Sequence, residues 1–274
     1  MLLLTMQRLL AARLWLSSFL GLLWLSACAA EPPAFPAGFL FGTAIAPYQT
    51  EGGLTATDWA QWETACPACS RQRADDGPSF WTRYASDLDQ AQAMHTNTLR
   101  LGIDWSRVFP TEDRFPDRPD EAAVAHYQDI LAAARARGLR VMVTLQHYAL
   151  PVWIHDLRDP RRTGWEDPAI VDRFAAWAAF CGQRFGGAVD LWLTVNEPVP
   201  ALFAGWIGGV FPPGKSRAVR EGLLTLSHMM AAHARAYDAL HANDTRDADG
   251  DGQPVPPDQG REQDQGQQQG CCCS

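Results

Sequence analysis

Short apolar runs rich in branched and aromatic side chains alternate with longer segments of helical periodicity from residue 39 onward. The short runs have the length of buried strands, whereas the longer segments repeat apolar residues at the spacing of one helix face. Strands are predicted in the runs that begin at Phe39, Thr98, Val141 and Leu191, and helices over Phe80–Met94, Asp120–Arg137, Pro168–Phe185 and Val219–His241. This alternation predicts an α/β fold built on a parallel sheet.

Two of the helical segments show which face they should bury. In the third, Cys181 shares an apolar face with Ile170, Phe174 and Trp177, so we expect this cysteine to pack as a small hydrophobic residue. The fourth repeats Leu226, Met230, His233 and Tyr237 at helical spacing. This spacing favours core or boundary positions for Met230 and His233 over a role as ligating residues.

Polar side chains stand at or near the ends of three of the predicted strands. The strand ends carry Gln49 and Glu51, then His147, then Asn196 and Glu197. Pro198 prevents the last strand from continuing, and the carboxyl ends of parallel strands meet at the active-site face of barrel enzymes. Glu197 is therefore a candidate catalytic acid, although a helix N-terminus or a surface turn would use the same residues.

Arg100 lies inside the second apolar run, where an unpaired guanidinium would be costly. We therefore expect an acceptor for it within the fold.

Five segments in order resemble glycoside hydrolase family 1, the β-glucosidase family. They are Tyr48–Gly52, Leu99–Pro110, Thr144–Trp153, Thr194–Pro198 and the loop Phe203–Gly214. The resemblance implies a (β/α)8 barrel, of which residues 39–242 would supply about four βα units. An endoglucanase barrel with the same Asn-Glu-Pro triplet is a rival, but it does not require the segment Tyr48–Gly52.

The resemblance also implies roles for individual side chains. Glu197 matches the general acid/base of a retaining enzyme, and Arg100 matches the arginine that holds the nucleophilic carboxylate ionised. A β-glycoside or oligosaccharide substrate would be bound by Gln49, His147 and Asn196, with Trp153 as an apolar wall. Two alternatives stay open: His147 could be a satisfied core histidine, and Arg100 could pair with Glu197.

The segment Ile/Val-Thr-Glu-Asn-Gly that carries the family's nucleophile does not occur in these 274 residues. We therefore expect the chain to be inactive by itself. A non-catalytic, exported sugar-binding remnant or a half-barrel lipoprotein is the alternative function.

The N-terminus has the pattern of a bacterial export signal. Arg8 and Arg13 precede the apolar stretch Leu14–Leu25, too short for a confident membrane span, which predicts a signal peptide over residues 1–27. The sequence Leu25–Cys28 resembles a lipobox, so Cys28 is the expected lipidation site, with an ordinary cleavable signal as the alternative. Residues 28–38 would form a linker, and the protein would be a periplasmic or outer-membrane lipoprotein.

From Asn243 onward the composition changes to Asp, Gly, Gln and Pro, which predicts a disordered tail over residues 243–274. A frameshift near Gly252 would explain the break. Asp247–Gly252 fits the opening of a calcium loop, but no flanking helix follows, so neither a metal nor a cofactor is expected.

Two further features bear on chemistry. Cys66 and Cys69 lack the second pair of ligands that a structural zinc site needs. In an oxidising compartment they favour a local disulfide over zinc. The formal net charge of −8 argues against nucleic acid as a partner, because neutralising phosphates needs a basic surface.

Overall fold

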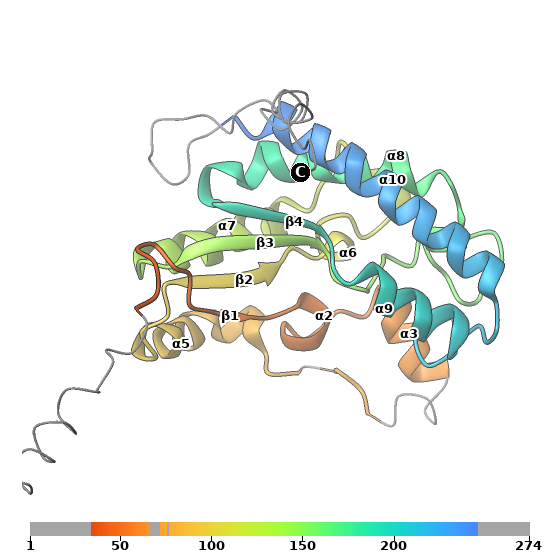
Figure 1. Cartoon of the computed structure of the whole chain (residues 1–274), viewed down its shortest axis with the longest axis horizontal. Coiled ribbons are helices and arrows are strands. Elements are labelled where there is room, and N and C mark those ends of the chain that lie inside the picture. The colour runs from red at the N-terminus through yellow and green to blue at the C-terminus, as the bar shows by residue number, and fades with distance from the viewer. Residues whose placement is uncertain (1–33, 66–71, 76, 246–274) are drawn as a thin grey trace, which may run out of the picture. The chain divides into compact units, whose positions relative to one another are not determined.

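Four short parallel strands form the centre of the computed structural model, which describes residues 34–65, 72–75 and 77–245. They are β1 (Gly42–Ala44), β2 (Thr98–Gly102), β3 (Arg140–Gln146) and β4 (Leu191–Val195), and they lie side by side in sequence order (Figure 1). Residues 34–39 belong to a separate unit of the chain, and everything below concerns residues 40–245. The predicted parallel α/β fold is confirmed.

The register of the sheet brings the ends of β3 and β4 to the same level. Gln146 pairs with Val195, so the residues that follow each of them leave the sheet together. The backbone N–H of Asn196 also donates to the carbonyl of Gln146 at 3.0 Å, which extends the pairing by one step. His147 and Asn196 are consequently neighbours.

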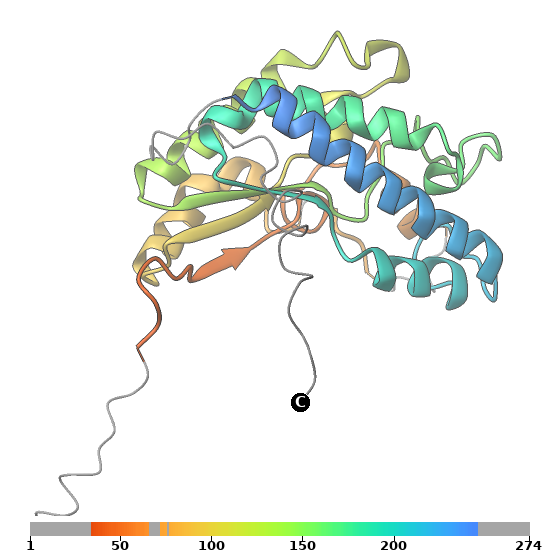
Figure 2. The ribbon, with the colours of Figure 1, turned by 45° about the horizontal axis from the view of Figure 1, so that its top comes forward.

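Long helices follow the strands as the periodicity predicts. They are α5 (Phe80–Ala93), α7 (Glu121–Ala136), α8 (Ile170–Phe185) and α10 (Val219–Asn243). Asp120 caps α7 by accepting from the backbone N–H groups of Ala122 and Ala123 at 3.0 and 3.1 Å. Helix α10 packs along α8 in both views (Figures 1 and 2).

Shorter helices occupy the connections between these elements. They are α2 (Pro47–Thr50), α3 (Asp58–Ala65), α6 (Trp105–Val108), α9 (Pro198–Leu202), the 3-10 turns η1 (Glu112–Arg114), η2 (Gly164–Glu166) and η3 (Gly186–Ala188), and the π-helical η4 (Phe203–Ile207). Helices α2 and α9 begin directly after β1 and β4, so they carry polar residues at the carboxyl end of the sheet.

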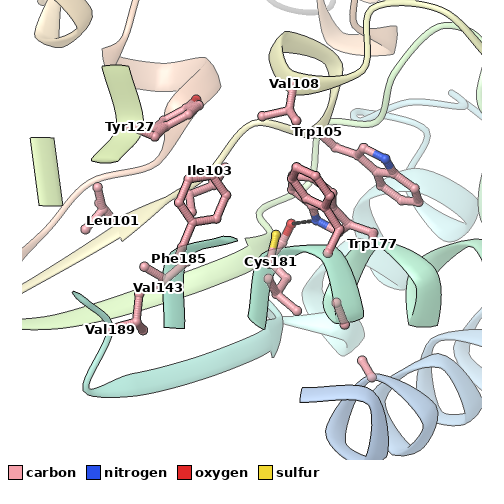
Figure 3. Packing of buried hydrophobic residues seen from close by; sticks show 14 of the residues in the cluster. Leu101, Ile103, Trp105, Val108, Tyr127, Val143, Trp177, Cys181, Phe185 and Val189 are labelled. Carbon is pink, nitrogen blue, oxygen red and sulfur yellow. Dashed lines mark hydrogen bonds between the residues drawn. The ribbon is translucent and has the colours of Figure 1, made fainter. Parts of the chain in front are cut away.

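The main core lies between the sheet and α7 and α8, and its centre is aromatic (Figure 3). The rings of Trp105 and Trp177 are stacked at a centroid distance of 5.5 Å. Phe174 and Cys181 are also fully buried on the predicted face of α8, and burial raises the pKa of the Cys181 thiol well above its ordinary value. The prediction that Cys181 packs as a small hydrophobic residue is confirmed.

The first predicted strand is shorter than the pattern indicates. It ends at Ala44, and Pro47 then opens helix α2, because proline lacks the N–H that a strand ladder needs and suits a helix start. Gly102 permits this turn, since a Cβ there would lie 2.5 Å from Cδ of Pro47. Gln49 is therefore exposed on a helix, and Glu51 is buried at its end.

The predictions for β4 and α10 need correction. Strand β4 was predicted to be buried, yet Leu191 is 38% exposed, because β4 is an edge strand of the described sheet. Helix α10 buries the stripe that contains Met229, Ala232, Ala236 and Leu240 rather than the predicted one. Met230, His233 and Tyr237 instead line an open groove beside β4.

The predicted boundary of the folded region at residue 242 is also too early. Asn243 ends α10, and Asp244 is 4% exposed and accepts a hydrogen bond from the Trp192 indole at 2.7 Å. Composition alone assigns Asp244 to the polar tail, but the structure gives this residue a partly buried hydrogen-bond donor.

Several predictions fall outside the described residues. They concern the signal peptide with Cys28, the linker up to residue 33, the pair Cys66 and Cys69, and the tail from residue 246 with its calcium-loop sequence. Within the described ranges, no helix is both long and apolar enough to span a membrane, and no three His, Cys, Asp or Glu side chains converge as metal ligands would.

Candidate active site

The polar residues predicted for the site gather at the carboxyl ends of the strands. Gln49 lies on α2 after β1, His147 follows β3, and Asn196 and Glu197 follow β4. Parallel strands deliver their carboxyl ends to one edge, which is why residues far apart in sequence meet here.

Arg100 lies in the middle of β2, and its guanidinium is the centre of a hydrogen-bonded chain across the sheet. Its Nε donates to Oγ1 of Thr144 on β3 at 2.9 Å, and its Nη2 donates to Oδ1 of Asn196 at 2.5 Å. The predicted internal acceptor therefore exists, and it is the Asn196 amide together with a threonine. The alternative in which Arg100 pairs with Glu197 is not what the structure shows.

Asn196 is buried, and its amide is oriented by these contacts. It is 7% exposed, and its Nδ2 lies 3.5 Å from Nε2 of His147. Because Oδ1 is occupied by Arg100, Nδ2 is the part of the amide that faces His147. An amide held in this way is a fixed donor for a hydroxyl group.

His147 is a neutral imidazole with an unused nitrogen. Burial and the positive charge of Arg100 lower the pKa of His147 to about 4, with Glu197 opposing the shift. Its Nδ1 is buried and has no hydrogen-bond partner in the described part of the chain. That observation does not fit a satisfied core histidine, and His147 lines the wall of the cavity described below.

Glu197 stands at the junction between β4 and α9 with a left-handed backbone, φ 47° and ψ 60°. Pro198 begins α9 immediately after it. Non-glycine residues adopt this conformation at a cost and are found preferentially at functional sites. The Glu197 side chain is exposed, and its Oε2 accepts a hydrogen bond from the Tyr148 hydroxyl.

An aromatic cavity of about 420 Å³ opens next to these groups. Gln49, His147 and Tyr148 line it together with aromatic residues of the connecting segments, namely Tyr48, Trp59, Trp62 and Phe211. Trp59 and Phe211 meet edge to face at 4.9 Å. Apolar ring faces with a few fixed polar groups at one end are typical of small-molecule sites.

The chain matches the model of glycosyl hydrolase family 1 over residues 31–251. It belongs to this family.

Relatives within family 1 carry names of two related activities. A beta-galactosidase of Pyrococcus woesei is 32% identical over 265 residues, covering 79% of this chain and 52% of that protein. Beta-glucosidase 40 of Arabidopsis thaliana is 35% identical over 188 residues, covering 66% of this chain and 36% of that protein. The chain thus spans about half or less of the length of these curated relatives.

Solved structures of the family share the fold. The beta-glycosidase of Thermosphaera aggregans has a TM-score of 0.72 at 27% identity, covering 78% of this chain and 54% of that one. A rice beta-glucosidase in a covalent complex with Glc has a TM-score of 0.70 at 30% identity, covering 76% and 46%. The predicted (β/α)8 barrel class is confirmed, and four strands of it are described here.

Trp153 is not among the residues that line the aromatic cavity. It is 4% exposed, its indole donates to the carbonyl of Phe109 at 2.7 Å, and its ring packs edge to face on Trp105. The prediction that Trp153 forms a wall for the sugar is therefore wrong, because the β3 connection turns this side chain into the core. The cavity receives its aromatic walls from Trp59, Tyr148 and Phe211 instead.

Two residues of the family segments take places that the sequence did not indicate. Tyr148 immediately follows His147, which is a candidate sugar-binding residue. That position is the only sequence signal that could have predicted a role for Tyr148 in the site. Glu51 turns away from the cavity, and its carboxylate accepts from the Tyr127 hydroxyl at 2.8 Å and from Nε of Arg107 at 3.0 Å. One family segment therefore supplies the cavity with Gln49 and the interior with Glu51.

Proposed function

We propose that this chain carries the acid/base and sugar-binding part of a retaining β-glycosidase that acts on β-glucosides or β-galactosides. The observation that carries the proposal is the hydrogen-bonded set Arg100–Asn196 and Tyr148–Glu197 at the carboxyl end of the sheet, beside an aromatic cavity. The names of the family-1 relatives support the choice of substrate class.

In this proposal Glu197 donates its proton to the glycosidic oxygen as the bond to the anomeric carbon breaks, and later takes a proton from water. Asn196 offers Nδ2 to a sugar hydroxyl, because Arg100 holds its other amide atom. His147 is neutral above about pH 4 and lines the cavity in which the sugar would lie. Gln49 reaches the same cavity from α2.

A retaining mechanism needs a second carboxylate about 5–5.5 Å from the first. These 274 residues contain no Thr-Glu-Asn-Gly segment to supply it. We therefore propose that the 274-residue chain binds the sugar by itself and cleaves only when another segment supplies that carboxylate. Sugar binding without catalysis is the second candidate function, and the aromatic cavity lined by Gln49 and His147 favours a ligand in either case.

Two measurements on the full chain test these proposals. Titration with methyl β-glucoside, followed by tryptophan fluorescence, should show saturable binding that Asn196→Ala weakens by about tenfold, the worth of one good hydrogen bond. An Asn196→Ala variant that binds as well as the original chain would remove the sugar-binding site from this cluster. Thr55→Ala, at an exposed residue that does not line the cavity, is the control.

Hydrolysis of cellobiose tests the catalytic part, and the 274-residue chain alone should show none. Where hydrolysis is seen, Glu197→Gln should lower kcat by about a hundredfold or more, the usual contribution of a general acid. Equal, measurable rates for the two proteins would exclude Glu197 as the acid.

We also propose that the protein is exported and lipid-anchored through Cys28. The support is the signal-like segment and the lipobox-like sequence Leu25–Cys28. Incorporation of labelled palmitate in a bacterial host should occur and should be lost in Cys28→Ala. Equal labelling of the two proteins would refute the anchor at this position.

A further inference from the structure

Tyr148 and Glu197 occupy equivalent places just after the ends of neighbouring strands. Gln146 of β3 pairs with Val195 of β4, and Tyr148 and Glu197 each follow two residues later. Both have left-handed backbones, with φ of 66° and 47°. This repeated turn directs the two side chains toward one another, and the Tyr148 hydroxyl donates to Oε2 of Glu197.

The phenol ring of Tyr148 is fixed by other aromatic rings. It packs edge to face on Phe211 at 5.5 Å and on His147 at 5.0 Å, and it lies 6.4 Å from Trp59. Phe211 and Trp59 lie far from Tyr148 in the sequence, so the ring is held by other segments of the fold as well as by its own strand end. The Glu197 carboxylate, in contrast, is exposed and has no other side-chain hydrogen bond among the described residues.

We propose that Tyr148 is a positioning residue for Glu197, whose hydroxyl holds Oε2 of the carboxyl group and thereby turns Oε1 toward the aromatic cavity. This inference rests on the proposed role of Glu197 as the general acid. During cleavage the proton on Oε1 moves to the glycosidic oxygen, and the electrons of the breaking bond stay on that oxygen. Tyr148 keeps its own proton throughout, so the hydroxyl orients the acid without supplying the proton.

The surroundings of Tyr148 keep its hydroxyl protonated. Burial and the hydrogen bond to the Glu197 carboxylate raise the pKa of Tyr148 to about 12, while Asn196 and Arg100 oppose the shift. A phenol in this state is a donor over the whole range in which the protein would work. A phenylalanine at this position would keep the aromatic wall and lose only the donor.

The contact can be tested without any enzymatic activity. The chain has five tyrosines, so tyrosine labelled with an NMR-visible isotope at the ring carbon bearing the oxygen gives five signals, and Tyr148→Phe identifies one of them. At about pH 11, one unit above the ordinary tyrosine pKa of about 10, the Tyr148 signal should still be that of a neutral phenol. In Glu197→Gln it should ionise at lower pH, because the carboxylate is gone.

Tyr127 provides an internal control for folding. Its hydroxyl also contacts a carboxylate, that of Glu51, which Glu197→Gln does not touch. The Tyr127 signal should be the same in both proteins. A Tyr148 signal that titrates identically in the original chain and in Glu197→Gln, with Tyr127 unchanged, would overturn the inference.

Where hydrolysis is seen, a kinetic comparison separates two roles of Tyr148: orienting the Glu197 carboxyl group and lining the aromatic cavity. Tyr148→Phe should lower kcat for methyl β-glucoside by about tenfold or more, because its poor leaving group needs a well-placed acid. It should leave dinitrophenyl β-glucoside within about twofold, because that leaving group needs little protonation. Equal losses on both substrates would overturn the positioning role.

The two proposals fail in different ways. If Glu197→Gln shifts the Tyr148 titration but does not affect cleavage, the contact is real and the proposed acid is wrong. If Glu197→Gln abolishes cleavage while the Tyr148 titration stays unchanged, Glu197 is the acid and Tyr148 does not hold it.

Discussion

Two tyrosine–carboxylate pairs in this molecule have the same chemistry and opposite surroundings. Tyr127 donates to Glu51 in the interior, where both residues are less than 5% exposed. Tyr148 donates to Glu197 at an exposed strand end. The interior pair has a cation, since Arg107 contacts Glu51 at 3.0 Å, whereas no described arginine bonds to Glu197. Burial and a counter-charge make the first carboxylate structural, and exposure leaves the second one free to react.

The interior pair also explains how the exposed site is held. Arg107 donates to the carbonyl of Gly52 at 2.7 Å and lies 3.9 Å above the ring of Trp81. The Tyr127 hydroxyl accepts from the backbone N–H of Asp104 at 2.9 Å. These contacts fix the end of α2, and α2 carries Gln49 into the cavity. The buried carboxyl group of Glu51 therefore helps to hold α2, and with it Gln49, in place at the candidate binding site.

The largest difference between the two regions is expected for their arginines. At about pH 9, above the raised pKa of Glu51, Arg107→Met would leave an ionised Glu51 carboxylate buried without a counter-charge, which should cost about 3–5 kcal/mol of unfolding free energy. Arg100→Met would leave only the neutral oxygens of Thr144 and Asn196 without this donor, at about 1–2 kcal/mol. Urea unfolding followed by tryptophan fluorescence measures both. Equal losses would mean that the charge of Glu51 is not what distinguishes the two regions.

The strand and helix order of the fold was predictable from the sequence, because each long helix shows its own periodicity and its own end signals. Asp120 as a cap and Gly138 with φ +76° at the end of α7 are local features of this kind. The gathering of Gln49, His147, Asn196 and Glu197 was also predictable, because parallel strands place their carboxyl ends together. These predictions depend on neighbours in sequence or on one rule of topology.

The remaining features depend on contacts between distant segments. The burial of Trp153 is decided by Phe109 and Trp105, and the role of Tyr148 by a register that brings Gln146 opposite Val195. Asp244 is ordered because Trp192 needs an acceptor. No periodicity within one segment reports such partners, which is why the aromatic wall was assigned to the wrong residue.

The pH dependence of stability should also separate the two carboxylates. Burial raises the pKa of Glu51 to about 8, although Arg107 and Tyr127 pull it down. The folded protein therefore binds a proton there more tightly than the unfolded chain, whose glutamates titrate at about 4.3. The stabilisation from Glu51 is complete below about pH 4 and is lost as the pH rises through about 8, by an amount on the order of a few kcal/mol.

Urea unfolding at about pH 5 and about pH 9 should show this decline in the original chain and a flatter profile in Glu51→Gln, since glutamine does not titrate. His147 titrates in the opposite sense, because its lowered pKa of about 4 makes the folded state bind protons less tightly. The Glu51→Gln comparison removes that contribution, since both proteins contain His147. A profile in Glu51→Gln as steep as in the original chain would place the titrating group elsewhere.

The smallest expected difference is between the two hydroxyl groups. Tyr127→Phe removes a donor from the buried Glu51 and an acceptor from the N–H of Asp104, which should cost about 1–3 kcal/mol. Tyr148→Phe removes a donor from an exposed carboxylate that water can solvate, so its cost should stay within about 0.5 kcal/mol. Unfolding by urea measures both, and Tyr84→Phe controls for loss of a hydroxyl elsewhere. If Tyr148→Phe proved as costly as Tyr127→Phe, Tyr148 would be part of the structural framework, and a loss of activity in that variant would say nothing about the position of Glu197.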